Sequence, residues 1–536
     1  MLTTTAVQAQ TYELFLGDEY MEESTVQPPK IVGYNSEGYY ALQVKPALHA
    51  YLAFIPIRLS KEATYIRRYA FDLVPKQTKV IDLRTQRNKE EVLDLIMAQG
   101  KLHLFSTFND KRHRTVQLMH REVEVATLAV PAKGSVLATV SYDGFPDYKN
   151  TSFGLYLSRD SSKIMVQYQF PNRKDSPERF AVHLFNDEMI PLWNQEYQLP
   201  YAEGLFEIQR FRVDNEANAY LLGKRYRDRP KDRVKGEPNY DFVALVLNPN
   251  LDTPTEIVLD APGRFLVDMH MEILRGRMIC AGIYGEGKPV SPRGIYYLTL
   301  DATTQQVIQE SYKPFALSMF DSGDDAEADE ESQTARQQKQ QEKKQRQREQ
   351  SLYRYDFNDI VLRSDGGAVL VGEENYFYVV STYVPTGNGG GYWRYTTYYY
   401  RNDILTIDIS PEGQIDGITR VPKRQRQTQA THLISYAMAI SQGRIHFVFN
   451  DRAENLALGP NDTPRYYTPS IFGKDKQVIS LLSLDPSGTI ERRSLLSTRD
   501  ADMYALPQAS IQVSSNELIL FFYRGSRRRM GRITFL

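Results

Sequence analysis

Apolar and polar residues alternate along this chain in short runs, and each run ends at a turn rich in Asp, Asn, Pro or Gly. The segment DILTIDISPEGQI at 403–415 is typical, because an alternating run meets a Pro-Glu-Gly turn and a second run then begins. A period of two places successive side chains on opposite faces, so the pattern predicts half-buried β-strands joined as hairpins. Apolar runs rarely exceed six residues, which favours strands over helices.

The same arrangement recurs through the whole chain in two alternating versions. An inner, more apolar hairpin is followed by an outer hairpin with a more polar second strand. Inner hairpins begin near 32, 93, 153, 206, 269, 359, 437 and 509, and outer hairpins near 67, 115, 179, 240, 294, 403 and 477. The outer copy at 115, TVQLMHREVEVATLAV, is the weakest.

A repeating unit of four antiparallel strands predicts a propeller, in which each blade covers the apolar face of its neighbour. The last inner hairpin is followed by a single strand, RRMGRITFL, and TYELFLGDEY near the N-terminus supplies the missing fourth strand. We therefore predict an all-β fold, a β-propeller of about eight four-stranded blades, with seven as the alternative. Its N- and C-terminal strands share one blade, which removes two open sheet edges.

Two strands carry the same order of residue types. KLHLFSTFNDKR (101–112) and RIHFVFNDRAE (444–454) both run from a basic residue through His to Asn-Asp, so His103 and His446 should occupy equivalent positions. Either histidine is more simply a hydrogen-bonded strand residue than a metal ligand facing the central channel. The Asn-Asp pairs are typical of turns.

The chain is predicted to form one propeller domain over 11–536, with two insertions. Residues 321–352 form a charged low-complexity segment whose acids precede its bases, and it is expected to be partly helical or disordered because it has no apolar face. Residues 378–403 are predicted to form a Tyr- and Gly-rich hairpin. Its aromatic residues are candidates for binding a protein or a glycan, or for packing on the neighbouring blade; the binding candidates are Tyr383, Tyr392, Trp393, Tyr395 and Tyr398.

The first residues indicate export. MLTTTAVQAQ (1–10) is interpreted as the remnant of a signal peptide, because Val7-Gln8-Ala9 fits a small-x-small cleavage pattern. The alternative is an ordinary terminus of a cytosolic protein. The single Cys280 allows no internal disulfide and is expected to be buried, so the predicted location is a bacterial envelope, periplasmic or secreted.

Charge and motifs exclude several classes of function. The 65 basic and 66 acidic residues give a net charge of −1, which provides no general attraction for nucleic acid. Basic runs at 423–427 and 524–532 are interpreted as solvent-exposed. No sequence signature of a transmembrane segment, a cofactor or a metal site is found, and a monomer is expected.

Carboxylates near strand ends leave an enzymatic alternative open. Asp268, Asp359, Glu373 and Asp451 are weak catalytic candidates that could converge at the channel mouth. Two of them within about 10 Å in one apolar-walled pocket would favour a carbohydrate-active hydrolase or lyase.

The C-terminal third carries a family resemblance. YYYRNDILTIDISPEGQIDGITRVPKRQRQ, SYAMAISQGRIHFVFNDRAEN and FFYRGSRRRMGRITFL resemble segments of a widespread set of exported, uncharacterised β-propeller-like proteins of Bacteroidota. The resemblance implies export and β-rich repetition, and it implies no activity. The leading hypothesis is a non-enzymatic protein- or glycan-binding scaffold in the bacterial envelope.

Overall fold

The structure is a computed structural model of the 536-residue chain. The residues that it describes are 12–47, 49–52, 55–58, 62–84, 89–142, 151–170, 177–202, 204–234, 237–250, 253–287, 291–316, 355–363, 365–385, 391–428, 431–459, 462–469, 476–498 and 502–536. The expected signal-peptide remnant (1–10) and the charged insertion (321–352) both lie outside the described residues.

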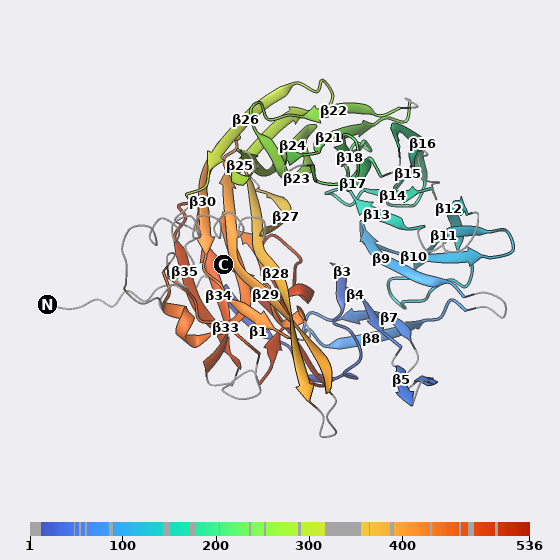
Figure 1. Ribbon diagram of the computed structural model, residues 1–536. Helices are drawn as coiled ribbons and strands as arrows, with labels where there is room; N and C mark the ends of the chain where they lie inside the picture. Colours follow the sequence, from blue (N-terminus) through green and yellow to red (C-terminus); the bar gives the residue numbers. More distant parts are fainter. Residues whose placement is uncertain are drawn as a thin grey trace, which may run out of the picture.

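The described strands form a β-propeller in which successive sheets are arranged around a ring (Figure 1). Sheets 1 to 4 are β3 (Lys30–Asn35), β4 (Gly38–Lys45), β7 (Ala63–Tyr69) and β8 (Pro75–Ile81); β9 (Glu91–Ala98), β10 (Lys101–Asp110), β11 (Thr115–Val123) and β12 (Ser135–Ser141); β13 (Phe153–Leu157), β14 (Lys163–Gln169), β15 (Pro177–Asn186) and β16 (Pro191–Ala202); and β17 (Phe206–Val213), β18 (Ala219–Tyr226), β21 (Tyr240–Leu247) and β22 (Thr255–Leu259).

Sheets 5 to 8 complete the set. They are β23 (Phe265–Leu274), β24 (Arg277–Glu286), β25 (Ser291–Asp301) and β26 (Val307–Pro314); β27 (Tyr355–Leu362), β28 (Ala368–Pro385), β29 (Gly391–Ile409) and β30 (Ile415–Val421), with β31 (Gln425–Gln427) on β29; β32 (Ala437–Ser441), β33 (Arg444–Arg452), β34 (Gln477–Leu484) and β35 (Ile490–Ser497); and β36 (Tyr504–Ala505), β37 (Ile511–Gln512), β38 (Glu517–Arg524), β39 (Arg527–Phe535), β1 (Tyr12–Leu16) and β2 (Tyr20–Met21).

Each sheet buries its two faces against different neighbours. In β24, Met278 and Cys280 belong to the apolar cluster shared with sheet 4, whereas Ile279, Ala281 and Ile283 belong to the cluster shared with sheet 6. The period of two in the sequence therefore becomes a division between two interfaces. Such a cluster joins every consecutive pair of sheets, and one more joins sheet 8 to sheet 1.

The ends of the chain close the ring as predicted. Strand β1 pairs antiparallel with β39, from Tyr12 opposite Phe535 to Leu16 opposite Gly531. The predicted β-propeller and its shared terminal blade are confirmed. The number of sheets in the described residues agrees with the expected set of about eight blades.

The outer hairpin of sheet 2 differs from its prediction. TVQLMHREVEVATLAV was expected to contain both strands, yet the chain leaves β11 at Val123 and the partner strand β12 begins at Ser135. Residues 124–129 form a turn instead. The Glu124 N–H donates to the Ala129 carbonyl (3.1 Å), and Leu128 takes a left-handed conformation (φ 55°). The remaining elements are short: β5 (His49–Leu52), β6 (Ile55–Arg58), β19 (Arg233–Val234), β20 (Glu237–Pro238) and the 3-10 helices η2 (Thr431–Leu433), η3 (Ala453–Ala457) and η5 (Pro507–Ala509).

Candidate functional site

Two strands of sheet 6 are much longer than the strands beside them. Strands β28 and β29 have 18 and 19 residues, and they extend past the body of the ring (Figure 1). Their outer parts pair in continuous register from Tyr376 opposite Tyr400 to Pro385 opposite Gly391. We call residues 376–385 and 391–400 the aromatic ribbon. It contains the five predicted binding residues.

The register divides the aromatic ribbon into two faces, because directly paired residues share a face and the next pair lies on the opposite one. Tyr383 and Trp393 are opposite each other, with ring centroids 5.4 Å apart, and Tyr395 lies on the same face. We call this the open face. Five of its large side chains are well exposed, and Tyr399, opposite Phe377, is half-buried; the exposed ones are Phe377 (64%), Val379 (54%), Tyr383 (49%), Trp393 (58%) and Tyr395 (68%).

The second face is partly covered near the ring. Tyr376 stacks on Tyr400 at 4.7 Å, and Tyr400 meets Tyr466 edge to face at 6.0 Å. The Arg426 guanidinium lies 5.7 Å from the Tyr398 ring. Of the predicted binding residues, Tyr392 and Tyr398 belong to this second face, as does Arg394, the one charged residue among 376–385 and 391–400.

Sequence reasoning found the aromatic ribbon but missed part of its open face. Phe377 and Val379 lie one pair to either side of Tyr378, and they were not among the predicted residues. The available signal was the alternation of Phe377, Val379, Ser381 and Tyr383 at every second position, which places all four on one face of a strand.

A buried polar network fixes the base of the aromatic ribbon. Lys423 is fully buried, and its Nζ lies 2.8 Å from Glu373 Oε1 of β28. The same Nζ donates to the Arg401 carbonyl of β29 (2.9 Å) and to Gln425 Oε1 (3.0 Å). Burial lowers the pKa of Lys423. Residues of the run 423–427 were expected on the surface, and for Lys423, Arg424 and Gln425 that expectation is wrong.

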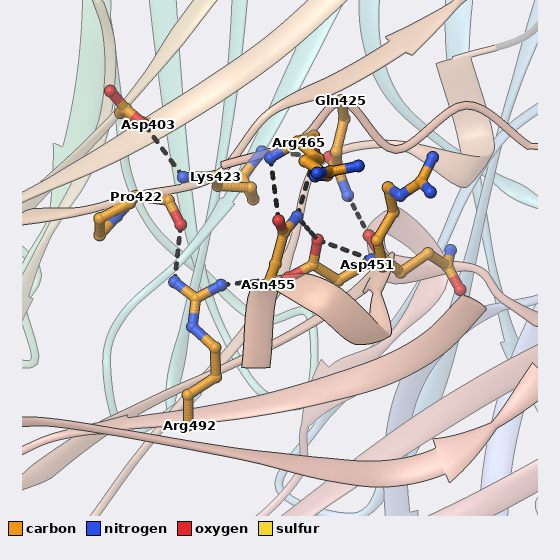
Figure 2. A network of polar contacts seen from close by, with 10 residues as sticks. Asp403, Pro422, Lys423, Gln425, Asp451, Asn455, Arg465 and Arg492 are labelled. Atoms are coloured by element: carbon orange, nitrogen blue, oxygen red, sulfur yellow. Dashed lines mark hydrogen bonds and ion pairs between the residues drawn. The ribbon is translucent and has the colours of Figure 1, made fainter. Parts of the chain in front are cut away.

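The network continues into sheet 7 (Figure 2). Asp451 of β33 pairs with Arg492 of β35 at 3.1 Å, and both side chains are almost fully buried. Asn455 Nδ2 donates to Asp451 Oδ1 (2.6 Å), and Arg492 Nη2 donates to the Pro422 carbonyl (2.7 Å). Burial raises the pKa of Asp451, and the neighbouring Arg492 opposes that rise. The interpretation of Asp451 as a turn residue is wrong, because it lies within β33.

These contacts tie sheet 6 to sheet 7 at the point where the ribbon leaves the ring. The backbone N–H of Lys423 donates to Asp403 Oδ1 (2.9 Å), and Arg420 Nε donates to Asp403 Oδ2 (2.6 Å). Buried charges that are paired and hydrogen-bonded in this way have few alternative arrangements. The base of the aromatic ribbon is therefore rigidly held.

The four candidate catalytic carboxylates lie in different surroundings. Glu373 and Asp451 belong to the buried network. Asp268, on the innermost strand β23, lies 3.2 Å from His270 Nε2. Asp359 belongs to β27, and its side chain lies outside the described residues. Asp268, Glu373 and Asp451 do not line either of two cavities, of about 280 and 550 Å³, that the described residues form.

The histidines and the cysteine have structural surroundings. His103 Nδ1 and His120 Nε2 share a hydrogen bond of 3.0 Å, while His446 Nδ1 lies 2.8 Å from Ser483 Oγ and its ring stacks on Phe535. Burial lowers the pKa of His120 to about 4 and that of His446 to about 4. Cys280 is buried, as predicted, which raises its thiol pKa to about 12. The described residues contain no cluster of three or more His, Cys, Asp or Glu placed to hold a metal ion.

Comparisons with known proteins add little beyond these observations. No protein-family model and no curated protein matches the chain. Among solved structures, it is similar to the WD40 domain of SCAP from fission yeast (TM-score 0.40, 8% identity, 100% of this chain and 97% of that chain covered). It is also similar to the β-propeller domain of the trilobed protease from Pyrococcus furiosus (TM-score 0.33, 10% identity, 91% and 97% covered) and to polysaccharide lyase Uly1 (TM-score 0.34, 9% identity, 97% and 100% covered). These likenesses are too distant to carry an argument about function.

In the part of the chain that the structure describes, no helix has the length and apolar character needed to span a membrane.

Proposed function

We propose that this protein is a non-enzymatic scaffold that binds another protein through the open face of the aromatic ribbon. The observation that carries the proposal is a row of exposed apolar side chains, including Tyr383, Trp393 and Tyr395, on a rigidly held base. Exposed apolar patches of this kind mark interaction sites, and Trp and Tyr contribute most to binding energy at protein interfaces. Because the base is fixed by buried ion pairs, binding does not have to order that part of the ribbon.

The chemistry of the open face favours a protein over a glycan. Sugar-binding sites combine an aromatic platform with polar groups that fix the hydroxyls. Residues 376–385 and 391–400 include no carboxylate and no side-chain amide. Apolar and aromatic side chains without charge match instead the central part of a protein interface, where charged residues are depleted. The partner should therefore present an apolar, weakly charged surface.

The ion pairs of Glu373 and Asp451 support binding rather than the alternative hydrolase or lyase. Each carboxylate already has a cationic partner, Lys423 or Arg492, and is buried with it. A general acid or base must reach the substrate. These two residues are better suited to fixing the ribbon.

We place this activity in a bacterial envelope and assign it to a monomer. The support for export is the small-x-small pattern in MLTTTAVQAQ together with the resemblance of the C-terminal third to exported proteins of Bacteroidota. The single cysteine, Cys280, is buried and suits a fold that needs no disulfide.

Neighbouring residues on opposite faces give a matched test. Trp393 (58% exposed) lies on the open face and Tyr392 (56% exposed) on the second face. A photo-crosslinking amino acid placed at Tyr395 should give one reproducible protein adduct in envelope extract of the host, whereas the same group at Val258, exposed on β22, should not. With the purified partner, Trp393→Ala should weaken binding at least about 30-fold and Tyr392→Ala by less than about threefold.

Three outcomes would overturn the proposal. Adducts that are the same at positions 395 and 258 would show that the open face has no selectivity. Equal effects of Trp393→Ala and Tyr392→Ala would remove the face assignment. A dimer seen by light scattering and lost in Trp393→Ala would show that the occupant is a second copy of this chain. Glycan binding lost in the same variant would show that the occupant is a sugar.

A further inference from the structure

A cavity of about 550 Å³ lies where the ends of four innermost strands meet. Its lining comes from β13, β17, β23 and β27, which belong to four consecutive sheets and follow the inner edge of the ring (Figure 1). In β13, β17 and β27 the lining residues are the last three, and in β23 they directly precede the last residue, so the cavity is at one mouth of the central channel. This volume is in the range of small-molecule sites.

The walls of this cavity are mostly apolar. Leucine and isoleucine residues come from three of the four strands, and Tyr156 packs on Phe211 with ring centroids 5.7 Å apart. Besides these two aromatic residues, the apolar lining residues are Leu155, Leu157, Val213, Ile273, Ile360, Val361 and Leu362. An apolar lining with a few polar groups is the usual composition of a site for an organic ligand.

Three charged side chains line the cavity, and two of them compensate each other. Arg212 donates from Nε (2.8 Å) and from Nη2 (2.5 Å) to Glu272 Oε1. The third is Arg159, in the turn after β13. Its Nη2 donates to the Leu362 carbonyl of β27 at 3.3 Å, so this hydrogen bond joins sheet 3 to sheet 6.

Arg159 is the charge available for a ligand. Among the described residues no carboxylate lies within ion-pair distance of it, and the bond to the Leu362 carbonyl uses one of the five N–H groups of a guanidinium. The adjacent Asp160 is engaged elsewhere, because its Oδ1 accepts hydrogen bonds from Ser158 Oγ (2.7 Å) and from the Ser162 N–H (3.0 Å). The described lining residues therefore carry one more positive than negative charge, beside apolar walls.

We propose that this cavity binds a small amphipathic carboxylate, with the apolar part against the leucine and isoleucine walls and the carboxylate on Arg159. A planar guanidinium binds a carboxylate through two parallel hydrogen bonds, which a lysine cannot reproduce. The site is distinct from the aromatic ribbon and does not depend on its function.

Calorimetric titration of the full chain with octanoate tests the proposal. Octanoate should bind saturably at one site. Octanol, which lacks the charge, and acetate, which lacks the apolar part, should each bind at least tenfold more weakly. An N-acetylated trileucine with a free C-terminus, compared with its C-terminal amide, distinguishes a peptide carboxylate from a fatty acid as the natural source.

Substitutions at Arg159 connect the binding to the site. Arg159→Gln should weaken octanoate binding at least tenfold, and Arg159→Lys should give an intermediate loss. Arg84→Gln is the matched control, because Arg84 is an exposed arginine paired with Asp82 in its own loop. Absence of saturable octanoate binding, equal binding of octanol, or unchanged affinity in Arg159→Gln with an unchanged unfolding curve would each overturn the proposal.

Discussion

Strands β10 and β33 have the same order of residue types and carry the same Asn-Asp pair at or next to their last residue, yet the two pairs lie in opposite surroundings. Asp110 is at an exposed turn, where its Oδ1 accepts the backbone N–H of Arg112 (3.0 Å) and of His113 (3.2 Å). Asp451 is buried against Arg492. The difference arises because β11 follows β10 after a short turn, whereas β33 is followed by η3 and a longer connection to β34.

The comparison shows what a sequence motif leaves open. An Asn-Asp pair after a strand predicts a turn because both side chains hydrogen-bond nearby backbone groups. At Asn450 the same amide reaches other segments, donating to the carbonyls of Leu433 (2.9 Å) and Ala505 (2.8 Å). Whether such an Asn-Asp pair forms an exposed turn or is buried depends on which other segments pack against the end of its strand.

The largest expected difference between the two copies is at the aspartates. Asp451→Ala leaves Arg492 buried without its carboxylate, so the free energy of unfolding should fall by about 3 to 5 kcal/mol. Asp110→Ala removes only hydrogen bonds at an exposed turn, from the Arg112 and His113 N–H groups and the His113 ring, and should cost less than about 1 kcal/mol. Urea unfolding followed by far-UV circular dichroism measures both. Equal losses would show that the two strand ends are energetically alike.

A smaller difference is expected at the asparagines. Asn450→Ala removes two donated bonds and the bond that Oδ1 accepts from the Ala505 N–H (3.0 Å), so it should cost about 2 to 3 kcal/mol. Asn109→Ala removes one bond from the Tyr142 hydroxyl (2.8 Å) and should cost about 1 kcal/mol. The same unfolding measurement compares them, and an Asn109 loss as large as that at Asn450 would contradict the assignment.

The histidines should behave alike in the two copies. The pKa of His446 is lowered to about 4, so the unfolded chain, with an ordinary histidine pKa near 6.5, binds the proton first on acidification. The contribution of neutral, buried His446 to the free energy of unfolding is therefore complete above about pH 6.5 and is lost as the pH falls towards 4. His103, whose pKa burial also lowers, follows the same sign.

This last effect is the smallest and can be isolated by difference. Between pH 7 and pH 5, the loss of unfolding free energy should be about 1 to 2 kcal/mol smaller in His446→Gln than in the unaltered protein. His103→Gln should change the pH dependence in the same direction. A loss that stays the same in both variants would mean that other groups cause the acid sensitivity.

The sequence predicts the sheets well because their signal is local. Alternation, turn residues and the missing fourth strand depend on residues that are close in the chain, and they led to the pairing of β1 with β39. Burial of Lys423 and Asp451 has no such signal. Their partners Glu373 and Arg492 are tens of positions away, and a run such as KRQRQ looks the same whether it is solvated or paired.

The candidate site shows the same limit. Aromatic composition identified the ribbon, but assigning Trp393 to the open face and Tyr392 to the second face required the hairpin register. The cavity beside Arg159 was not predicted at all, because its walls come from four sheets spread between residues 155 and 362.

The pairing of β1 with β39 has a consequence for synthesis on the ribosome. Strand β39 lies between β38 and β1, so the fourth position of this sheet is filled by residues made before the other blades and the third by residues made after them. Until β39 has been made, Tyr12, Leu14 and Leu16 lack the β39 residues that they meet in the finished ring. Closure of the ring therefore depends on the synthesis of β39, and a chain truncated before β39 would keep β1 as an unpaired strand open to association with other chains.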